Sequence, residues 1–429
     1  MPLRLDSGDA GFADAFDGML AKRRAHDEDV RAAVSEILAD VRARGDAAVF
    51  ALTERFDGVA LDSGTIRVSE AQVDAAVAAV AADQRRALDL AAERIEAYHR
   101  RQLPADDRYV DSAGVELGHR WTAVSSAGLY VPGGKAAYPS SVLMNAVPAR
   151  VAGVERLAMV VPAPGGDINP LVLAAARVAG IDEIYRIGGA QAVAAMAYGT
   201  DSVAAVDKIV GPGNAYVAEA KRQVFGTVGI DMIAGPSEIL VYADDRNDPA
   251  WIAADLLSQA EHDESAQSIL LADSAGFADA VAEAVETTLT TLTRAAIASA
   301  SWRDHGVIVV VRDSEEAVAL IDRVAPEHLE LPRDDADAVA AKVRNAGAIF
   351  LGRYTPEAVG DYVAGPSHVL PTARSAKFAS GLSVLDFVKR TSLVRCDAAS
   401  LAVVGGAAAT LADAEGLGAH ALSVRIRMN

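Results

Sequence analysis

Hydrophobic residues recur along most of the chain in two patterns: short unbroken runs, and longer stretches with apolar positions three or four apart. The runs predict buried strands and the longer stretches predict amphipathic helices. From residue 156 to 226 the two alternate three times, and the strand runs with their turns are RLAMVVPAPGG (156–166), EIYRIGGAQ (183–191) and DKIVGPGN (207–214). Such alternation is typical of βαβ units, so we expect a parallel sheet covered by helices on both sides.

A second series of the same kind follows. Its strand runs are EILVYADD (238–245), QSILLADS (267–274), GVIVVVRDS (306–314) and AIFLG (348–352). The intervening helix at 248–263 has strong start signals, because Asp248 can cap it and Pro249 fits its first turn. We therefore expect two α/β units of similar build, with a ligand cleft between them.

Three further regions flank these series. Helical periodicity predicts amphipathic helices between Asp27 and Arg101. Alternating residues around Gly114 predict a hairpin over 109–122. After Ala379 the sequence predicts a short strand and an alanine-rich helix, whose apolar face must pack on the same chain or on a partner subunit.

Charge and composition narrow the class of protein. A net charge of −19 would repel a nucleic-acid backbone, so we expect no nucleic-acid partner. No stretch has the length of a membrane span, and the first residues lack the pattern of an export signal. One cysteine, Cys396, cannot form an internal disulfide. These features predict a cytoplasmic enzyme or binding protein without a membrane partner.

Glycine-rich turns follow two predicted strands of the first series, at residues 188–191 and 211–214. In parallel sheets, ligands bind beyond the carboxyl ends of the strands, where both turns are expected. Such turns bind anions, although many only reverse the chain. Because the sequence has no G-x-G-x-x-G, the pattern alone does not identify a dinucleotide.

Potential proton-transfer and metal-binding groups occur in the second series. Gln259 and His262 share one face of a predicted helix, although they could equally be its solvated end. Glu327 and His328 follow a proline in a predicted loop and could transfer protons near neutral pH. Asp361 could bind a metal or be a solvated loop residue.

Together these motifs resemble the histidinol dehydrogenase family. The resemblance rests on GLYVPGGKAAYPSSVLMNAVPA, IGGAQA, KIVGPGNAYVAEAK, IDMIAGPSE, LLSQAEHD, APEHLE, GDYVAGPSHVLPT, SGLSVLDFVKR and EGLGAHALSVRIR. It implies a homodimer that uses zinc and NAD to oxidise L-histidinol through the aldehyde to L-histidine. It also implies an α/β fold with two Rossmann-like doubly wound domains and small N-terminal and C-terminal dimerisation elements.

The resemblance further implies a role for particular residues. Zinc would be bound by Gln259, His262, Asp361 and His420, the last from the neighbouring subunit, and Glu327 and His328 would be the acid–base pair. The substrate would contact Ser237 and Glu415 together with His328 and the zinc ligands. NAD would contact Tyr130, Gln191 and Asn214.

The expected domain division has four parts. Residues 1–26 and 107–126 would form a small N-terminal and hairpin element, and residues 27–106 and 127–236 the first, NAD-binding domain. Residues 237–378 would form the second domain, and residues 379–429 a tail that packs on the partner.

Three other functions fit part of the pattern. A family relative could oxidise another small polar alcohol with NAD. A two-lobed protein could bind a small molecule in its cleft without chemistry, and a zinc hydrolase would need no nicotinamide.

Overall fold

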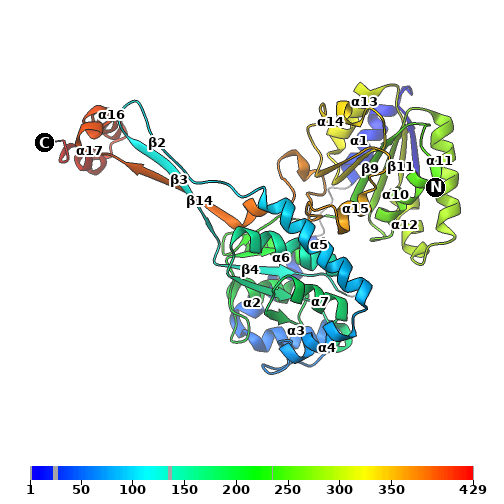
Figure 1. Ribbon diagram of the computed structural model, residues 1–429, viewed down its shortest axis with the longest axis horizontal. Coiled ribbons are helices and arrows are strands. Elements are labelled where there is room, and N and C mark those ends of the chain that lie inside the picture. The colour runs from blue at the N-terminus through cyan, green and yellow to red at the C-terminus, as the bar shows by residue number, and fades with distance from the viewer. Residues whose placement is uncertain (1, 23–27, 134–137, 234, 429) are drawn as a thin grey trace.

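The computed structural model describes residues 2–22, 28–133, 138–233 and 235–428. These residues form two parallel sheets, each covered by helices, and an extended arm (Figure 1). The mixed α/β class with parallel sheets is the one that the sequence predicts.

The first sheet has five parallel strands in the order β6-β5-β4-β7-β8. Its strands are β4 (Ser126–Tyr130), β5 (Arg156–Val160), β6 (Glu183–Tyr185), β7 (Lys208–Val210) and β8 (Gly229–Ile230). Successive strand residues face opposite sides, so that Leu129 packs in one hydrophobic cluster and Tyr130 in the other.

Helices cover both faces of this sheet, as expected for parallel strands. One face carries α4 (Glu70–Ala79), α5 (Ala82–Arg100), α6 (Pro139–Ala152) and α7 (Pro170–Val178). The other carries α2 (Glu28–Arg44), α3 (Asp46–Asp57), α8 (Gly189–Tyr198) and α9 (Ala215–Val224).

The second sheet has six parallel strands in the order β1-β11-β10-β9-β12-β13. They are β1 (Leu3–Asp6), β9 (Glu238–Ala243), β10 (Gln267–Ala272), β11 (Val307–Val310), β12 (His328–Leu331) and β13 (Ala348–Leu351). One face packs on α1 (Phe12–Lys22), α13 (Ser314–Val324) and α14 (Ala336–Ala340). The other packs on α10 (Pro249–Ala260), α11 (Ala275–Leu289) and α12 (Ala295–His305), and α15 (Glu357–Tyr362) follows β13.

The two sheets share one strand order. We number the strands of each sheet in the order in which they occur along the chain and leave out β1. Both sheets then have the spatial order 3-2-1-4-5. The two sheets are therefore built alike. In each sheet the order reverses between the first and fourth strands, which are β4 and β7 in one and β9 and β12 in the other.

The N-terminal segment differs from our expectation. We grouped residues 1–26 with the hairpin, but β1 pairs with β11 at the edge of the six-stranded sheet, with Leu3 opposite Val307. Phe16 of α1 is fully buried in the core of that sheet. The segment therefore belongs with the second unit, and a pairing between residues 304 positions apart leaves no local sequence signal. Residues 23–26 lie outside the described residues.

The expected loop after Pro326 holds for Glu327 but is wrong for His328. Residues His328–Leu331 form β12, in the interior of the six-stranded sheet between β9 and β13. Two of its four residues, His328 and Glu330, are polar and yet buried. A buried strand normally reads as an apolar run, which is why the pattern failed here.

The arm extends from the five-stranded unit and ends in the C-terminal helices (Figure 1). The predicted hairpin is confirmed as β2 (Asp107–Val110) and β3 (Glu116–Ala123), and β14 (Val388–Arg395) pairs antiparallel with β3. The helices at its tip are α16 (Ala398–Ala414) and α17 (Gly418–Arg425), with short 3-10 turns elsewhere at 164–166, 375–377 and 384–387. None of the helices within the described ranges is long and apolar enough to cross a membrane.

Candidate functional site

Helix α10 carries the first pair of candidate ligands. As predicted, Asp248 caps it by accepting a hydrogen bond from the Ala250 N–H at 2.9 Å, and Pro249 occupies its first turn. Gln259, near its end, is 1% exposed, and its Oε1 has no hydrogen-bond partner among the described residues. His262 follows the helix; burial lowers its pKa, and the charge of Asp361 opposes that effect.

Glu327 and His328 lie at the amino end of β12, beside the amino end of β9. The Glu327 carboxylate accepts a hydrogen bond from the Glu238 N–H at 2.9 Å. The Nδ1 atom of His328 lies 3.0 Å from the Glu238 carbonyl oxygen, so this nitrogen donates. The other ring nitrogen, Nε2, is left to face the rest of the site.

Helix α15 supplies two carboxylates opposite that nitrogen. His328 Nε2 lies 3.7 Å from Asp361 Oδ1 and 3.8 Å from Glu357 Oε1. Donor atoms of these three side chains all lie within 4.8 Å of one another, close enough to share one metal ion. The sequence analysis singled out Asp361 but not Glu357.

The buried carboxylates change one another's protonation. Burial raises the pKa of Glu327 to about 7 and that of Glu357 to about 8. Burial alone would lower the pKa of His328, but the negative charges of Glu327, Asp361 and Glu357 outweigh it and raise that pKa to about 10. Although burial opposes it, contact with the His328 ring lowers the pKa of Asp361. The site thus has an excess of acidic groups that a cation would balance.

His368 joins the two units at this site. Its Nδ1 lies 3.1 Å from the Asp361 carbonyl oxygen, and its Nε2 lies 3.3 Å from the hydroxyl of Ser141 in α6. A helix that covers the five-stranded sheet therefore contacts the cluster at the six-stranded sheet.

These residues fit a metal ion on three grounds. Gln259 Oε1, His328 Nε2 and Glu357 Oε1 are buried and lack a hydrogen-bond partner among the described residues, which is costly unless another group binds them. The nearby carboxylates supply negative charge. Mixed oxygen and nitrogen donors suit zinc. The set that the geometry brings together includes His328 and Glu357, which we did not count as ligands.

Two expected site residues lie elsewhere in the same chain. Glu415 directly follows α16 and His420 lies in α17, both exposed at the tip of the arm (Figure 1). Ser237, by contrast, immediately precedes β9 and therefore adjoins Glu238.

The expected cofactor residues gather at the carboxyl edge of the five-stranded sheet. Tyr130 ends β4, and its hydroxyl accepts a hydrogen bond from the Gly189 N–H at 3.0 Å. Gln191, in the first turn of α8, is 1% exposed with its Oε1 unpartnered among the described residues. Asn214 caps α9 through the Val217 N–H and is exposed.

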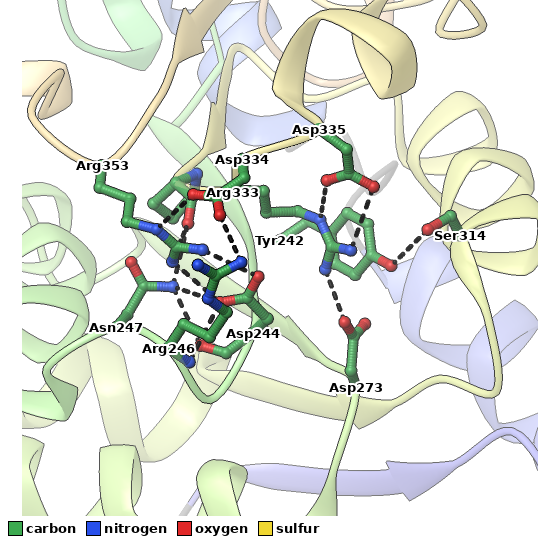
Figure 2. A network of polar contacts seen from close by, with 11 residues as sticks. Tyr242, Asp244, Arg246, Asn247, Asp273, Ser314, Arg333, Asp334, Asp335 and Arg353 are labelled. Carbon is green, nitrogen blue, oxygen red and sulfur yellow. Dashed lines mark hydrogen bonds and ion pairs between the residues drawn. The ribbon is translucent and has the colours of Figure 1, made fainter.

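At the carboxyl edge of the six-stranded sheet, ion pairs fill the space (Figure 2). After β12, the Arg333 guanidinium binds Asp273 at 2.6 Å and Asp335 at 2.8 Å, and it stacks 4.1 Å over the Tyr242 ring. After β13, Arg353 binds both carboxylate oxygens of Asp244, at 2.8 and 3.1 Å. This edge therefore has its charges paired, whereas the candidate chemistry lies at the opposite, amino edge.

Sequence reasoning missed several buried carboxylates around the site. Glu330 accepts a hydrogen bond from the Glu357 N–H at 2.5 Å, and Glu357 accepts one from the Ser258 hydroxyl at 3.0 Å. The available signal for Glu330 was a charged residue between two leucines, in LEL (329–331). Buried ionisable groups mark functional sites often enough to justify that inference.

Comparisons with known proteins agree along the whole chain. The family model described as histidinol dehydrogenase matches residues 20–428. The chain is 66% identical to histidinol dehydrogenase of Rhodospirillum rubrum, covering 100% of this chain and 99% of that one, and 63% identical to that of Ruegeria pomeroyi with the same coverage.

A solved structure agrees as well. The crystal structure of histidinol dehydrogenase from Elizabethkingia anophelis superposes with a TM-score of 0.94 at 34% identity, and the match covers 100% of this chain and 98% of that one. Sequence and fold lead to one conclusion: this chain belongs to the histidinol dehydrogenase family.

Proposed function

We propose that this protein oxidises L-histidinol through L-histidinaldehyde to L-histidine, using two NAD and one zinc ion per subunit. The observation that carries the proposal is the buried group of His328, Glu357 and Asp361 with Glu327 beside it. Such a group combines a cation site with an imidazole and a carboxylate that can transfer protons, and the pKa of the carboxylate, Glu327, is about 7.

We assign zinc to Gln259, His262, Asp361 and His420 of the partner subunit. The ion would hold the imidazole and amine of histidinol, so that its main contribution would be positioning. Ser237 and Glu415 would contact the substrate together with His328 and the zinc ligands.

His328 is the proposed base for both oxidations. Its Nδ1 donates to the Glu238 carbonyl oxygen, which leaves Nε2 to accept the hydroxyl proton, while a bound nicotinamide would take the hydride. The charge of a bound cation would offset the carboxylates that raise the pKa of His328 to about 10. Glu327 would activate the water that adds to the aldehyde. Its pKa of about 7 suits a group that takes and returns a proton at neutral pH.

We propose that NAD binds at the carboxyl edge of the five-stranded sheet through Tyr130, Gln191 and Asn214. The unpartnered Oε1 of Gln191 supports this assignment, since a buried amide oxygen requires a donor. The ion pairs that fill the equivalent edge of the six-stranded sheet support it further (Figure 2). We also propose that the enzyme works in the cytoplasm, where it can draw on the NAD pool.

We propose a homodimer in which each arm completes the partner's site. The arm exposes many large apolar side chains, namely Tyr109, Val110, Val394, Val403, Leu411, Leu417, Leu422 and Ile426. Exposed apolar patches of this kind mark association surfaces. A two-fold dimer would bring two arms to two sites.

The reaction is tested by counting NADH. With limiting histidinol and excess NAD, two NADH should form for each histidinol consumed. A family relative acting on another small polar alcohol is the alternative, and a panel of amino alcohols decides between them. A relative would show higher kcat/KM for another alcohol.

The shared site is tested by mixing two inactive variants, Gln259→Ala and His420→Ala, after dissociation and reassociation. In a mixed dimer one site keeps both groups and the other loses both. Random reassociation should therefore restore about a quarter of the wild-type activity. If each chain builds its own site, mixing would restore none.

A further inference from the structure

A buried ion pair holds both peptide groups of Gly211. The Lys221 ammonium, in α9, donates to the Gly211 carbonyl oxygen at 2.8 Å. The Asp231 carboxylate, just after β8, accepts from the Gly211 N–H at 2.8 Å and also from the Met232 N–H at 2.6 Å. Lys221 and Asp231 also contact each other directly. Together they fix the first residue of the 211–214 turn.

This pair lies deep in the protein. The Lys221 side chain is 2% exposed and the Asp231 side chain is 0% exposed. Removing two charges from water is costly, and an apolar pair of similar size often stabilises a fold as well or better. Stability alone therefore explains the buried pair of Lys221 and Asp231 poorly. Its hydrogen bonds to Gly211 explain it better, because they hold the loop in one geometry.

Gly211 lies where the proposed cofactor residues meet. Its φ is +114°, in the region that favours glycine, and a Cβ there would stand 2.1 Å from the Tyr130 carbonyl oxygen. The turn is thus pressed against the end of β4. The Tyr130 side chain in turn binds the N–H of Gly189, at the start of the helix that carries Gln191.

We propose that Lys221 and Asp231 are positioning residues for NAD. They hold the 211–214 turn against Tyr130, so that the turn and Asn214 are preorganised before the cofactor arrives. Preorganisation raises affinity because less ordering remains at binding. The proposal rests on the proposed NAD site, and neither side chain needs to touch the cofactor.

The test measures NADH binding by fluorescence titration of the dimer in the absence of substrate. Asp231→Asn keeps the size of the side chain but removes its charge, and we expect its NADH dissociation constant to rise at least about tenfold. The KM for NAD should rise in step, while the KM for histidinol and the zinc content stay unchanged.

The matched control is Glu183→Gln. Glu183 binds Arg156 at 2.8 and 2.9 Å in the same sheet, but at the amino edge. This variant should lose stability without a change in NADH affinity. If Asp231→Asn folds and binds NADH as tightly as the control does, the inference is wrong.

A second variant tests the inference if Asp231→Asn does not fold. Lys221→Met combined with Asp231→Leu leaves no uncompensated buried charge, so it should fold even where a single variant does not. Weak NADH binding by this double variant supports the inference, and wild-type affinity overturns it. A wild-type protein that fails to bind NADH would instead contradict the proposed function.

Discussion

The backbone of Glu238 forms a hydrogen bond with each member of the proposed acid–base pair, Glu327 and His328. The N–H at the start of β9 donates to the Glu327 carboxylate at 2.9 Å, while the carbonyl oxygen of the same residue lies 3.0 Å from His328 Nδ1. One residue of a neighbouring strand thus orients the carboxylate and selects the tautomer of the imidazole. The backbone of a sheet is rigid, so both groups are held before substrate binds.

Loss of the imidazole should stop the reaction. We expect His328→Ala to lower kcat by ~100-fold to 10,000-fold, the range for general-base catalysis. Zinc content, measured by atomic emission, should stay near one ion per subunit. A variant that keeps wild-type turnover would show that another group takes the proton.

The Glu327 carboxylate should act mainly in the second oxidation, from aldehyde to acid. Glu327→Gln keeps the contact with the Glu238 N–H but cannot accept a proton from water. We expect oxidation of histidinaldehyde to slow more than oxidation of histidinol, as measured by single-turnover NADH formation with each substrate. Equal slowing of both steps would contradict the assigned role.

Removal of the metal should cost both activity and stability. A strong chelator should abolish NADH formation and lower the melting temperature, and added zinc should restore both, since a bound ligand stabilises the folded state by mass action. His420→Ala should lower zinc retention. His119→Ala, which alters a histidine in β3 of the same arm, is the control and should retain zinc.

Acid stability should depend on Glu316. Hydrogen bonds from the Arg312 guanidinium, helped by the Ser7 hydroxyl, lower its pKa from about 4.5 to about 2. A folded-state pKa below the unfolded one contributes stability above about pH 4.5 that is lost as pH falls toward 2. Glu316→Gln should therefore flatten the fall in unfolding free energy over this range, with a cost at pH 7 of at most about 1 kcal/mol.

Urea unfolding at pH 7 and pH 3 measures this effect. Glu315→Gln is the matched control, because it removes the same charge from an exposed neighbour. Identical pH dependence in both variants would contradict the role of Glu316.

Gly347 should be sensitive to the smallest substitution. A Cβ on this residue would stand 2.5 Å from the Glu327 carbonyl oxygen and 3.1 Å from Pro371 Cδ. We expect Gly347→Ala to destabilise the protein by about 1–3 kcal/mol and to lower kcat by displacing Glu327. Gly276→Ala in α11, with nothing within 4 Å among the described residues, should be neutral or slightly stabilising.

Local periodicity predicted most elements of both sheets, because apolar runs and glycine turns are read from neighbouring residues. It failed at β12 because His328 and Glu330, at and beside the site, stand in a buried strand where apolar residues are expected. It could not reveal that β1 pairs with β11, or that β14 pairs with β3, because these contacts join distant segments.

The candidate site was foreseen in part. We expected Gln259 and His262 to share one face of a helix, but α10 ends at Ala260 and His262 lies in the turn after it. The proximity of His262 to Asp361 depends on how α15 packs. Glu357 carried no motif of its own and emerges only from its distance to His328.

The ion pairs beyond β12 and β13 also bear on attempts to redesign this scaffold. If Arg353 were replaced to open that end of the sheet for a second nucleotide, the carboxylate of Asp244 would lose its ion-pair partner, and Asp334 would keep only its pair with Arg246. The vacated space would then repel a pyrophosphate. Converting this half of the molecule into a cofactor pocket would require the acidic and basic residues to be exchanged together.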